Sequence, residues 1–390
     1  MHPQLLVIGG SARAAVWSAT PVFEKIAAID RFGDLDLREF ASVGVTASLR
    51  RKEVCRIMEQ KGWLDGRSPL VVIPAGGMEN QPTLWKWLQV NTQFAGTDWS
   101  HVRRVRDPKA LGQALKDSNV RFPESRFSGE PLPKEGAWLL KSKNSGGGIQ
   151  VSSWKRPEDS TFKLQLWTSS EYVQRQIDGS DYAATYVACQ GRVDLIGVTS
   201  QFWGLSEFGA RGHWYCGSVG PIPMDAASTR TLMQLGQRLV GDFELEGVFG
   251  VDLRWDGDSW WLLEVNPRYP AGAEVLERNA ERSVTQAYWN AREGMPVDWP
   301  TASKPGMIAK GIWFNQGESM GPIADFDFER VKRRGVPWKR EIADIPASTE
   351  VIPHGFPVFS AFSEVSTVED SIERLITTAR IWETLIFATI

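Results

Sequence analysis

The chain has 390 residues, enough for two or three domains, and a formal net charge of −3. Its 42% hydrophobic and 23% charged residues fit a folded protein with real cores, and the balanced charge excludes a strongly basic surface for nucleic acid or acidic membranes. With only 4 His and 3 Cys, all scattered, a structural zinc site or a disulfide scaffold is excluded, so any metal must be held by oxygen ligands.

The first hundred residues alternate strands and helices through glycine turns. Strands are predicted at 4–8, 26–30 and 69–74, and helices at 13–19 and 82–88. This alternation predicts an α/β region with a parallel sheet. The start of the sequence shows no secretory leader, and no run approaches the ~20 apolar residues of a membrane helix. We therefore expect a cytoplasmic protein that has no membrane partner.

Gly9 and Gly10 open the first turn, and Asp30 ends the second predicted strand. A strand, a glycine turn, a helix and then an acid superficially resemble the fingerprint of dinucleotide-binding proteins. The spacing differs, because the positions two and five residues after either glycine are not glycines. An NAD(P)-dependent oxidoreductase is therefore kept as an alternative function.

Further along the chain, the pattern changes to strands joined by turns. A helix is predicted from Pro108, which fits the first helical position. Strand patterns then follow from 137 to 263, interrupted by one helix over 228–241, and predict an α+β region with antiparallel sheets. Residues 303–390 combine short strands with a final helix.

The segment Lys141–Gly148 is predicted to be the tip of a hairpin between two strands. Its consecutive glycines, Gly146–Gly148, allow the backbone to fold closely over a ligand, and Lys141 can place an ammonium beneath them. A lysine combined with a glycine flap can hold phosphate groups. The alternative is a flexible hairpin tip without a ligand.

A second hairpin, with an Asp-Gly turn at 256–257, carries three oxygen donors. Glu264 and Asn266 share one face, and Asp252 lies opposite them only if the connecting loop has an odd number of residues, three or five with a bulge. Acids on a strand pair this apolar predict a bound cation, and Mg²⁺ prefers carboxylates plus phosphates. Arg268 can add a bidentate contact to an anion. The alternative is a polar edge that faces solvent.

These segments, taken in order, resemble the ATP-grasp superfamily. The match includes the glycine flap, the stretch 174–181, and Asp252 with the run Glu264–Arg268, and it spans about residues 100–290. The resemblance implies α/β plus α+β architecture in the ATP-grasp fold. That fold comprises a Rossmann-like N-terminal domain, two α+β subdomains that clamp ATP, and a small β-rich C-terminal region.

Two N-terminal stretches, 29–36 and 76–80, are similar to a poorly characterised ATP-grasp subgroup. Members of that subgroup often accompany tetrahydromethanopterin- and methanofuran-linked C1 metabolism. Among characterised enzymes, the chain resembles amide-forming ligases such as tyramine–glutamate ligase. The resemblance thus implies ATP-dependent ligation of a carboxylate to an amine through an acylphosphate, with the biosynthesis of a C1-carrier coenzyme as the candidate pathway.

The resemblance also implies roles for individual residues. ATP would be bound by Lys109, Lys141, Ser145, Gly146, Gly147, Gly148, Gln174, Gln176, Ile177 and Asp181. Mg²⁺, or Mn²⁺ in its place, would be held by Asp252, Glu264 and Asn266. Catalysis would involve Lys141, Asn266 and Arg268. Gln174 departs from the pattern, because many members have Glu at this position.

The implied domains are 1–103 (pre-ATP-grasp), 104–295 (ATP-grasp, with subdomains 104–178 and 179–295) and 296–390 (β-rich, with the terminal helix). The expected partners are a small-molecule carboxylate and an amine, with no nucleic acid, and a homodimer is compatible with the sequence. A non-catalytic nucleotide-binding protein on the same fold is the second alternative function.

Overall fold

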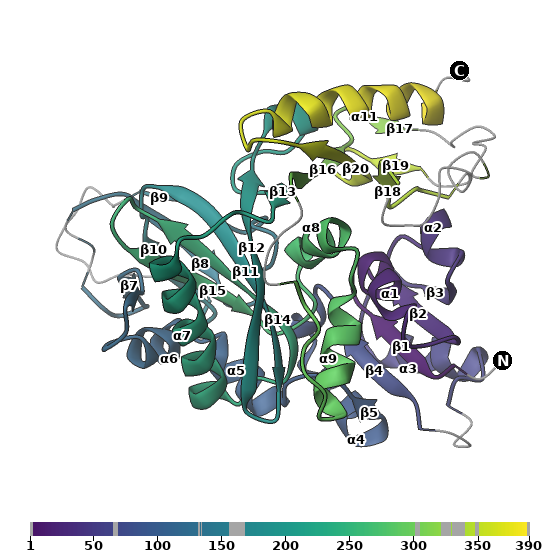
Figure 1. Ribbon diagram of the computed structural model, residues 1–390, viewed down its shortest axis with the longest axis horizontal. Coiled ribbons are helices and arrows are strands. Elements are labelled where there is room, and N and C mark those ends of the chain that lie inside the picture. The colour runs from purple at the N-terminus through teal and green to yellow at the C-terminus, as the bar shows by residue number, and fades with distance from the viewer. Residues whose placement is uncertain are drawn as a thin grey trace.

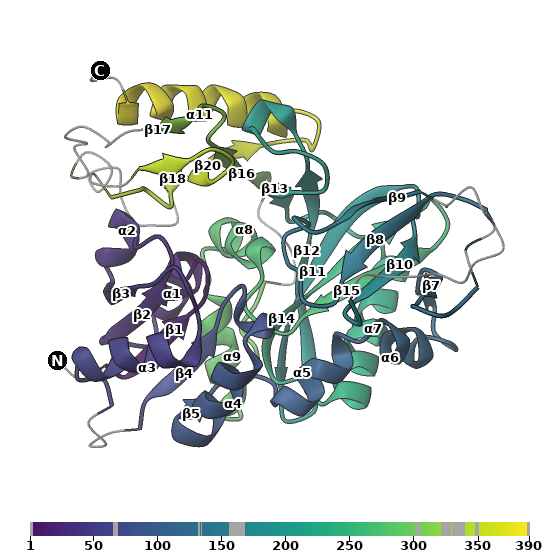
Figure 2. The same ribbon diagram turned by 180° about the vertical axis from the view of Figure 1, so that it is seen from behind.

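A computed structural model describes residues 3–64, 69–131, 133, 135–155, 168–300, 305–320, 329, 340–347 and 351–387. Figure 1 shows the N-terminal sheet with its helices beside a large central sheet, and helix α8 lies between the two. The C-terminal strands and helix α11 cover the top of the molecule in this view. The reverse view in Figure 2 shows the same arrangement.

The N-terminal sheet has five parallel strands in the order β3-β2-β1-β4-β5. Its strands are β1 (Leu5–Ile8), β2 (Ile26–Asp30), β3 (Ala41–Val45), β4 (Val71–Pro74) and β5 (Gln93–Phe94). Its helical segments are α1 (Arg13–Ala19), α2 (Leu35–Arg38), α3 (Arg51–Gln60), η1 (Met78–Asn80) and α4 (Pro82–Asn91). The sheet confirms the predicted parallel α/β region, because strands β1, β2 and β4 are fully buried, as apolar runs between helices require.

A small antiparallel sheet follows after two short helices. The helices are α5 (Trp99–Val105) and α6 (Pro108–Ala114), and Asp107 caps α6 by accepting a hydrogen bond from the Lys109 N–H. The strands, in the order β7-β10-β8-β9, are β7 (Ser125–Arg126), β8 (Trp138–Ser142), β9 (Ser152–Trp154) and β10 (Glu171–Arg175).

The largest sheet has nine strands in the order β18-β20-β16-β13-β12-β11-β14-β15-β6. Those strands are β6 (Val120–Arg121), β11 (Ser180–Cys189), β12 (Arg192–Trp203), β13 (Tyr215–Gly220), β14 (Gly247–Trp255), β15 (Trp260–Asn266), β16 (Met307–Phe314), β18 (Ile342–Ala343) and β20 (Pro357–Val365). Two short strands, β17 (Ser319–Met320) and β19 (Ile352–Pro353), pair with each other in a separate sheet. The sheet is thus continuous from the carboxylate hairpin to the C-terminal strands.

Four longer helices pack around the large sheet. They are α7 (Ala226–Phe243), α8 (Ala271–Ala280), α9 (Val284–Arg292) and α11 (Ser371–Phe387), and a short helical turn, η2 (Ser206–Phe208), precedes β13. Leu232, Leu235 and Leu239 of α7 are buried, as their predicted common face requires. Within the described residues, no helix is long and apolar enough to cross a membrane.

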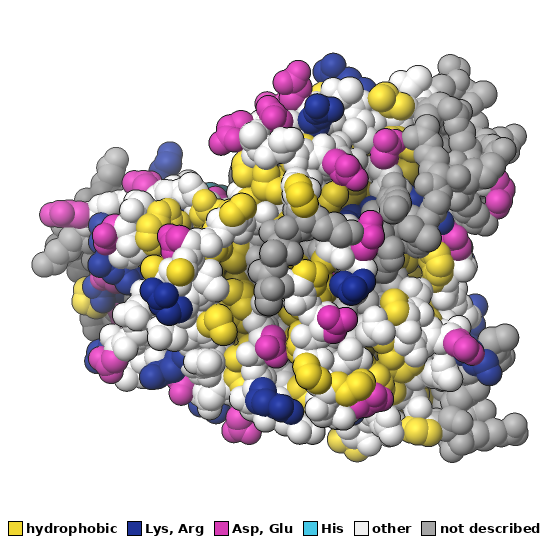
Figure 3. All heavy atoms as spheres, in the orientation of Figure 1, with side chains coloured by type: hydrophobic (Ala, Val, Ile, Leu, Met, Phe, Trp, Pro, Cys, Tyr) yellow, Lys and Arg dark blue, Asp and Glu magenta, His cyan; other side chains and the backbone are white. Residues whose placement is uncertain are grey.

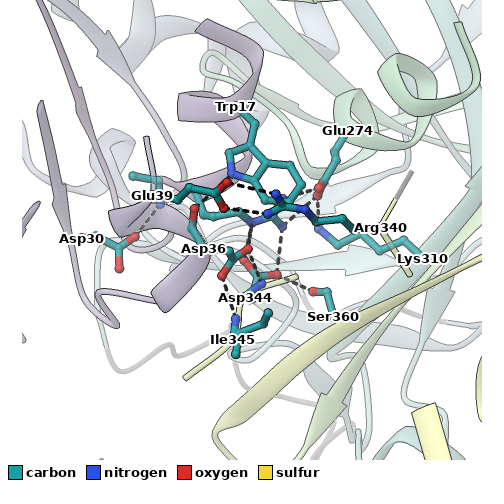
Figure 4. A network of polar contacts seen from close by, with 12 residues as sticks. Trp17, Asp30, Asp36, Glu39, Glu274, Lys310, Arg340, Asp344, Ile345 and Ser360 are labelled. Atoms are coloured by element: carbon teal, nitrogen blue, oxygen red, sulfur yellow. Dashed lines mark hydrogen bonds and ion pairs between the residues drawn. The ribbon is translucent and has the colours of Figure 1, made fainter. Parts of the chain in front are cut away.

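A buried cluster of charges joins the N-terminal, central and C-terminal elements. Arg13 of α1 donates hydrogen bonds to Glu274 of α8 and to Asp344 beyond β18. Lys310 of β16 and Arg278 of α8 also contact Glu274. Figure 4 shows Glu274, Lys310 and Asp344 of this cluster close to Trp17. Because Arg13, Glu274, Arg278 and Lys310 are buried and only Asp344 is partly exposed, the cluster fixes how the three parts of the chain meet.

Candidate active site

Asp252 of β14 lies directly opposite Glu264 of β15. The loop between the strands has four residues, Asp256–Ser259, so the prediction of an odd-numbered loop is wrong. The register shifts between Asp252 and Leu253, where β15 carries the extra residue Leu263. This β-bulge, and not the loop length, brings the two acids face to face.

The facing carboxylates form a polar cluster with two amides. Asn266 Nδ2 lies 3.1 Å from Asp252 Oδ2, and Gln201 Nε2 of β12, which β11 separates from β14, donates to Asp252 Oδ1 at 2.9 Å. Burial and the facing Glu264 raise the pKa of Asp252 to about 8. Two facing, half-buried carboxylates tend to share a proton unless a cation neutralises them, so the donor set fits a hard divalent ion.

Lys141 of β8 lies across the cleft from this pair. Its ammonium donates to Gln174 Oε1 of β10 at 3.0 Å. Burial lowers the pKa of Lys141, although the carboxylates of Glu264 and Asp252 partly oppose this shift. Burial alone would raise the pKa of Glu264, but Lys141 and the hydrogen bond with Asp252 outweigh it and hold the pKa below its usual value. A cation and an acid pair therefore face the same space.

The glycine flap connects the antiparallel strands β8 and β9, as predicted for a hairpin tip. Gly147 O accepts a hydrogen bond from the Tyr215 N–H at 3.0 Å, which ties the flap to the large sheet. A Cβ at Gly148 would lie 1.6 Å from the backbone oxygen of His213, and the φ of Gly148 is +73°. Only glycine therefore allows the flap to approach the sheet this closely.

Two arginines connect the flap and the carboxylate hairpin to the N-terminal turn. Arg106 donates to Glu79 O, to Asn80 Oδ1 and to Ser145 O at 2.8–3.0 Å. Arg268 donates to Glu79 Oε1 at 3.2 Å and to Asn266 Oδ1 at 3.1 Å. The stretch after β4 is thus part of the site, and not only a turn between a strand and a helix.

A cavity of about 630 Å³ opens beside this cluster, large enough for a small-molecule substrate. The residues that line the cavity include Ser11 and Gly76 from the N-terminal turns and Gly146 from the flap. Arg268, which follows β15, lines it as well. The C-terminal region also forms part of the wall, through residues such as Phe359. The substrate space therefore lies between the N-terminal sheet, the flap and the C-terminal strands.

The residues predicted to contact adenine and ribose already have protein partners. The backbone N–H of Gln176 donates to Ala137 O, and Ile177 O accepts from Arg254 Nη1 at 2.6 Å. Asp181 accepts two hydrogen bonds from Arg254, including a contact of 2.9 Å with Nε. These residues lie together where β10 passes into β11.

Lys109 lies on α6, with 59% of its side chain exposed. Its ammonium lies 3.6 Å from Glu130 Oε1 and 4.3 Å from the centre of the Phe127 ring. Within the described residues it forms no ion pair with the carboxylate hairpin. Ser145, in contrast, lies in the flap, and its backbone oxygen accepts from Arg106.

Asp30 is fully buried and already satisfied by the backbone. Its carboxylate accepts hydrogen bonds from the N–H groups of Ala12, Phe32 and Gly33 at 2.6–2.8 Å. The acid therefore holds the first glycine turn in place and is not exposed to a ribose. This geometry argues against the dinucleotide-binding alternative.

Two contributors to the site, Arg106 and Gln201, were not singled out from the sequence, whereas Glu79 lies in the stretch 76–80 that carries part of the family resemblance. Arg106 directly precedes the helix cap Asp107, so it is held where α6 begins. Two strands, β11 and β14, separate the strand of Gln201 from that of Glu264, and no local spacing reveals that proximity. A polar residue in the interior of an otherwise apolar strand pattern was the signal available for Gln201.

The comparison with known protein families agrees with this geometry. Residues 105–272 match the ATP-grasp domain family. The formate-dependent phosphoribosylglycinamide formyltransferase of Xanthomonas axonopodis pv. citri is 35% identical over 91 residues, which are 22% of this chain and 23% of that protein. The chain thus aligns with about a quarter of the length of this curated relative.

Solved structures resemble nearly the whole chain. Biotin carboxylase from Campylobacter jejuni has a TM-score of 0.70 at 13% identity and covers 95% of this chain and 89% of its own. The L-amino acid ligase from Bacillus licheniformis has a TM-score of 0.66 at 13% identity and covers 97% and 98%. At this identity the likeness shows the fold, and the chain has the ATP-grasp fold.

Proposed function

We propose, from the ATP-grasp fold of this chain, that the protein is an ATP- and Mg²⁺-dependent ligase that joins a carboxylate to an amine. The observation that carries the proposal is the half-buried Asp252–Glu264 pair, which faces Lys141 near the glycine flap and adjoins a cavity of substrate size. A fold alone requires none of these charges, and burying them without a ligand costs free energy.

The residues present fit the divalent cation that this chemistry uses. Asp252, Glu264 and Asn266 would hold Mg²⁺ through oxygen ligands. When bound, the ion neutralises phosphate charge. Lys141 would contribute a second positive charge to the phosphates, and the N–H groups of Gly146–Gly148 would donate hydrogen bonds from above.

The proposed reaction has two steps. A carboxylate oxygen attacks the γ-phosphorus of ATP, which forms an acylphosphate and releases ADP. The amine nitrogen then attacks the acyl carbon, phosphate leaves, and the nitrogen loses a proton. Arg268 would stabilise the charge on the transferring phosphoryl group, and no side chain of the protein acts as a nucleophile.

The names of the similar proteins point to different carboxylate substrates. The Xanthomonas relative is named for formate, and one structural neighbour is named an L-amino acid ligase. We propose amide formation between a small carboxylate and a small amine, and retain a step in C1-carrier coenzyme biosynthesis as the pathway suggested by the resemblance of residues 29–36. The proposal also includes a cytoplasmic location and a homodimer.

The experiment that tests this function has two stages. In the first, the thermal stabilisation of the protein by ATP with Mg²⁺ is compared with that by NAD; the proposal expects stabilisation by ATP alone. In the second, ADP release is measured with formate, bicarbonate and amino acids as carboxylates, each with and without a panel of amines. ADP release that requires neither a carboxylate nor an amine would overturn the proposed ligation.

A further inference from the structure

Asp34 is a buried acid whose carboxylate has no hydrogen-bond or ion-pair partner among the described residues. It is 3% exposed, lines the cavity, and its Oδ2 forms no hydrogen bond. Asp34 occupies the N-cap position of α2, but its side chain does not bond to the helix backbone. A capping aspartate usually accepts such a bond, so this carboxylate is available for another donor.

No cation in the described part of the chain bonds to Asp34, although the nearby charge of Arg13 partly opposes the rise in its pKa. Arg13 lines the same cavity, but its guanidinium is bonded to Glu274 and Asp344. Arg31 also lines it, and no hydrogen bond or ion pair joins Arg31 to Asp34 among the described residues. Burial, followed by the repulsion of Asp30 and Asp344, raises the pKa of Asp34 well above its usual value. A positively charged ligand would relieve this repulsion.

A metal ion is a poor candidate for this ligand. The other acids among the described residues that line the cavity, Glu79 and Asp344, are already paired with Arg268 and Arg13, so Asp34 has no second free carboxylate beside it to hold a metal. An ammonium group needs fewer oxygen neighbours than Mg²⁺ or Ca²⁺ does, because each of its N–H groups donates a single hydrogen bond.

The rest of the cavity presents exposed apolar side chains from distant parts of the chain. Ile149 follows the flap and is 65% exposed, while Val351 and Phe356 of the C-terminal region are 60% and 41% exposed. All three line the cavity that holds Asp34. On the face shown in Figure 3, acidic and basic side chains are interspersed with smaller apolar areas. Apolar side chains that converge on one cavity favour a ligand with an apolar body.

We propose that this cavity binds a substrate with a primary ammonium group on an apolar body, with the ammonium at Asp34 and the body against Ile149, Val351 and Phe356. The inference rests on the proposed function, because it takes the cavity as the substrate site of the ligase. It deepens that function by naming the chemical class of one substrate.

Isothermal titration of the full chain, without ATP, tests the proposal. The probes are hexylamine, hexanol and hexanoate, which share one apolar chain and differ in charge. Wild-type protein should bind hexylamine at least ~10-fold more tightly than hexanol, because a charge-assisted hydrogen bond is formed only with the amine. Asp34→Asn should lose this preference, and the exposed strand residue Asp194 provides a matched control, Asp194→Asn, that should retain it.

Phe356→Ala should weaken the binding of hexylamine and of hexanol by similar factors. This variant therefore tests the apolar wall of the cavity independently of Asp34. Wild-type protein that binds hexanol as tightly as hexylamine, that prefers hexanoate, or that binds none of the probes would overturn the proposal. Unchanged hexylamine binding by folded Asp34→Asn would do the same. Since ATP is absent, a failure of ADP release in the functional assay leaves these results unaffected, and the two proposals fail separately.

Discussion

Asp252 faces Glu264 across the β14–β15 pair because β15 contains one extra residue, Leu263. Without this bulge, a four-residue loop would place Leu263 opposite Asp252. Glu264 and Asn266 share a face through strand alternation, and the insertion brings that face opposite Asp252, which lies 3.1 Å from the Asn266 amide. A local irregularity in the ladder therefore assembles the three predicted metal ligands.

Replacing Lys141 should remove ATP-dependent turnover while the fold is retained. Lys141→Ala deletes the ammonium that faces the carboxylate pair, and its loss should lower the rate of ADP release by about 100-fold. The protein should remain folded, because burial already opposes the charge of this lysine. Lys86→Ala, an exposed lysine on α4, is the matched control. ADP release by Lys141→Ala at the wild-type rate would contradict the proposed role.

Glu264→Gln should weaken the divalent metal site. The substitution keeps the shape of the side chain but removes one of two carboxylates, so more Mg²⁺ should be needed for half-maximal ADP release. Chelation with EDTA should abolish turnover by the wild-type protein, and added Mg²⁺ or Mn²⁺ should restore it. Wild-type turnover by Glu264→Gln at low Mg²⁺ would exclude this residue as a ligand.

The two glycines at the end of the flap should differ in their response to alanine. A Cβ at Gly148 meets His213 O at 1.6 Å, whereas a Cβ at Gly147 meets nothing within 4 Å, although both residues have positive φ. Gly148→Ala should therefore raise the KM for ATP by at least ~10-fold, and Gly147→Ala should cost only the backbone strain of a left-handed alanine. Steady-state kinetics that show equal effects would indicate that the flap does not close on the large sheet.

Much of this site could be predicted because its parts are local in sequence. The Asp-Gly turn and the alternation along 247–266 predict the hairpin and the common face of Glu264 and Asn266. The bulge at Leu263 could not be predicted, because an extra residue in a ladder leaves no periodic signal. Likewise, Arg106 reaches Ser145 and Asn80 only through tertiary folding.

Helix α8 shows why the charged cluster was not anticipated. Its residues Gly272–Asn279 are all buried, including Glu274, Glu277 and Arg278. Acids and an arginine on several faces are typical of a helix at the surface. The sequence of α8 therefore shows no apolar stripe that would predict its burial. Its charges are satisfied instead by partners such as Arg13, which is 261 residues away in the sequence.

Glu277 should make the stability of the protein depend on pH. Burial raises its pKa to about 7, against the opposing effect of hydrogen bonds from the hydroxyls of Ser18 and Tyr269. The folded state therefore binds a proton that the unfolded state has already lost above a pH of about 4.3. Stability should fall as pH rises from about 4.3 to 7, by at most ~1.4 kcal/mol per pH unit from this group, and then become constant.

Glu277→Gln should remove this contribution, because the amide keeps the shape of the side chain and does not ionise. Urea unfolding of both proteins at pH 5, 6, 7 and 8 measures the effect as a difference in the free energy of unfolding. The variant should gain stability relative to wild type as pH rises to 7. A difference that stays constant over this range would show that the Glu277 pKa is not raised.

Glu274→Gln should be the most destabilising of these substitutions. Glu274 is 1% exposed and is shared by Arg13, by Lys310 at 2.8 Å and by Arg278 at 3.2 Å. Burial would raise its pKa, but these three cations outweigh it and hold the pKa well below its usual value. Removing the carboxylate charge takes away the counterion that these three cations share, and breaking comparable buried pairs costs ~3–5 kcal/mol.

The control is Glu53→Gln, which breaks the exposed Glu53–Arg56 pair of α3 and should change the free energy of unfolding by less than ~1 kcal/mol. The effect of salt on the free energy of unfolding also distinguishes the two variants. Added NaCl screens the exposed pair and leaves the buried cluster almost unchanged. Urea unfolding of both variants at low and high salt provides the measurement. If Glu274→Gln lost no more stability than Glu53→Gln, the cluster would not be what holds α1, α8 and β16 together, and the alignment of the substrate cavity would depend on apolar packing alone.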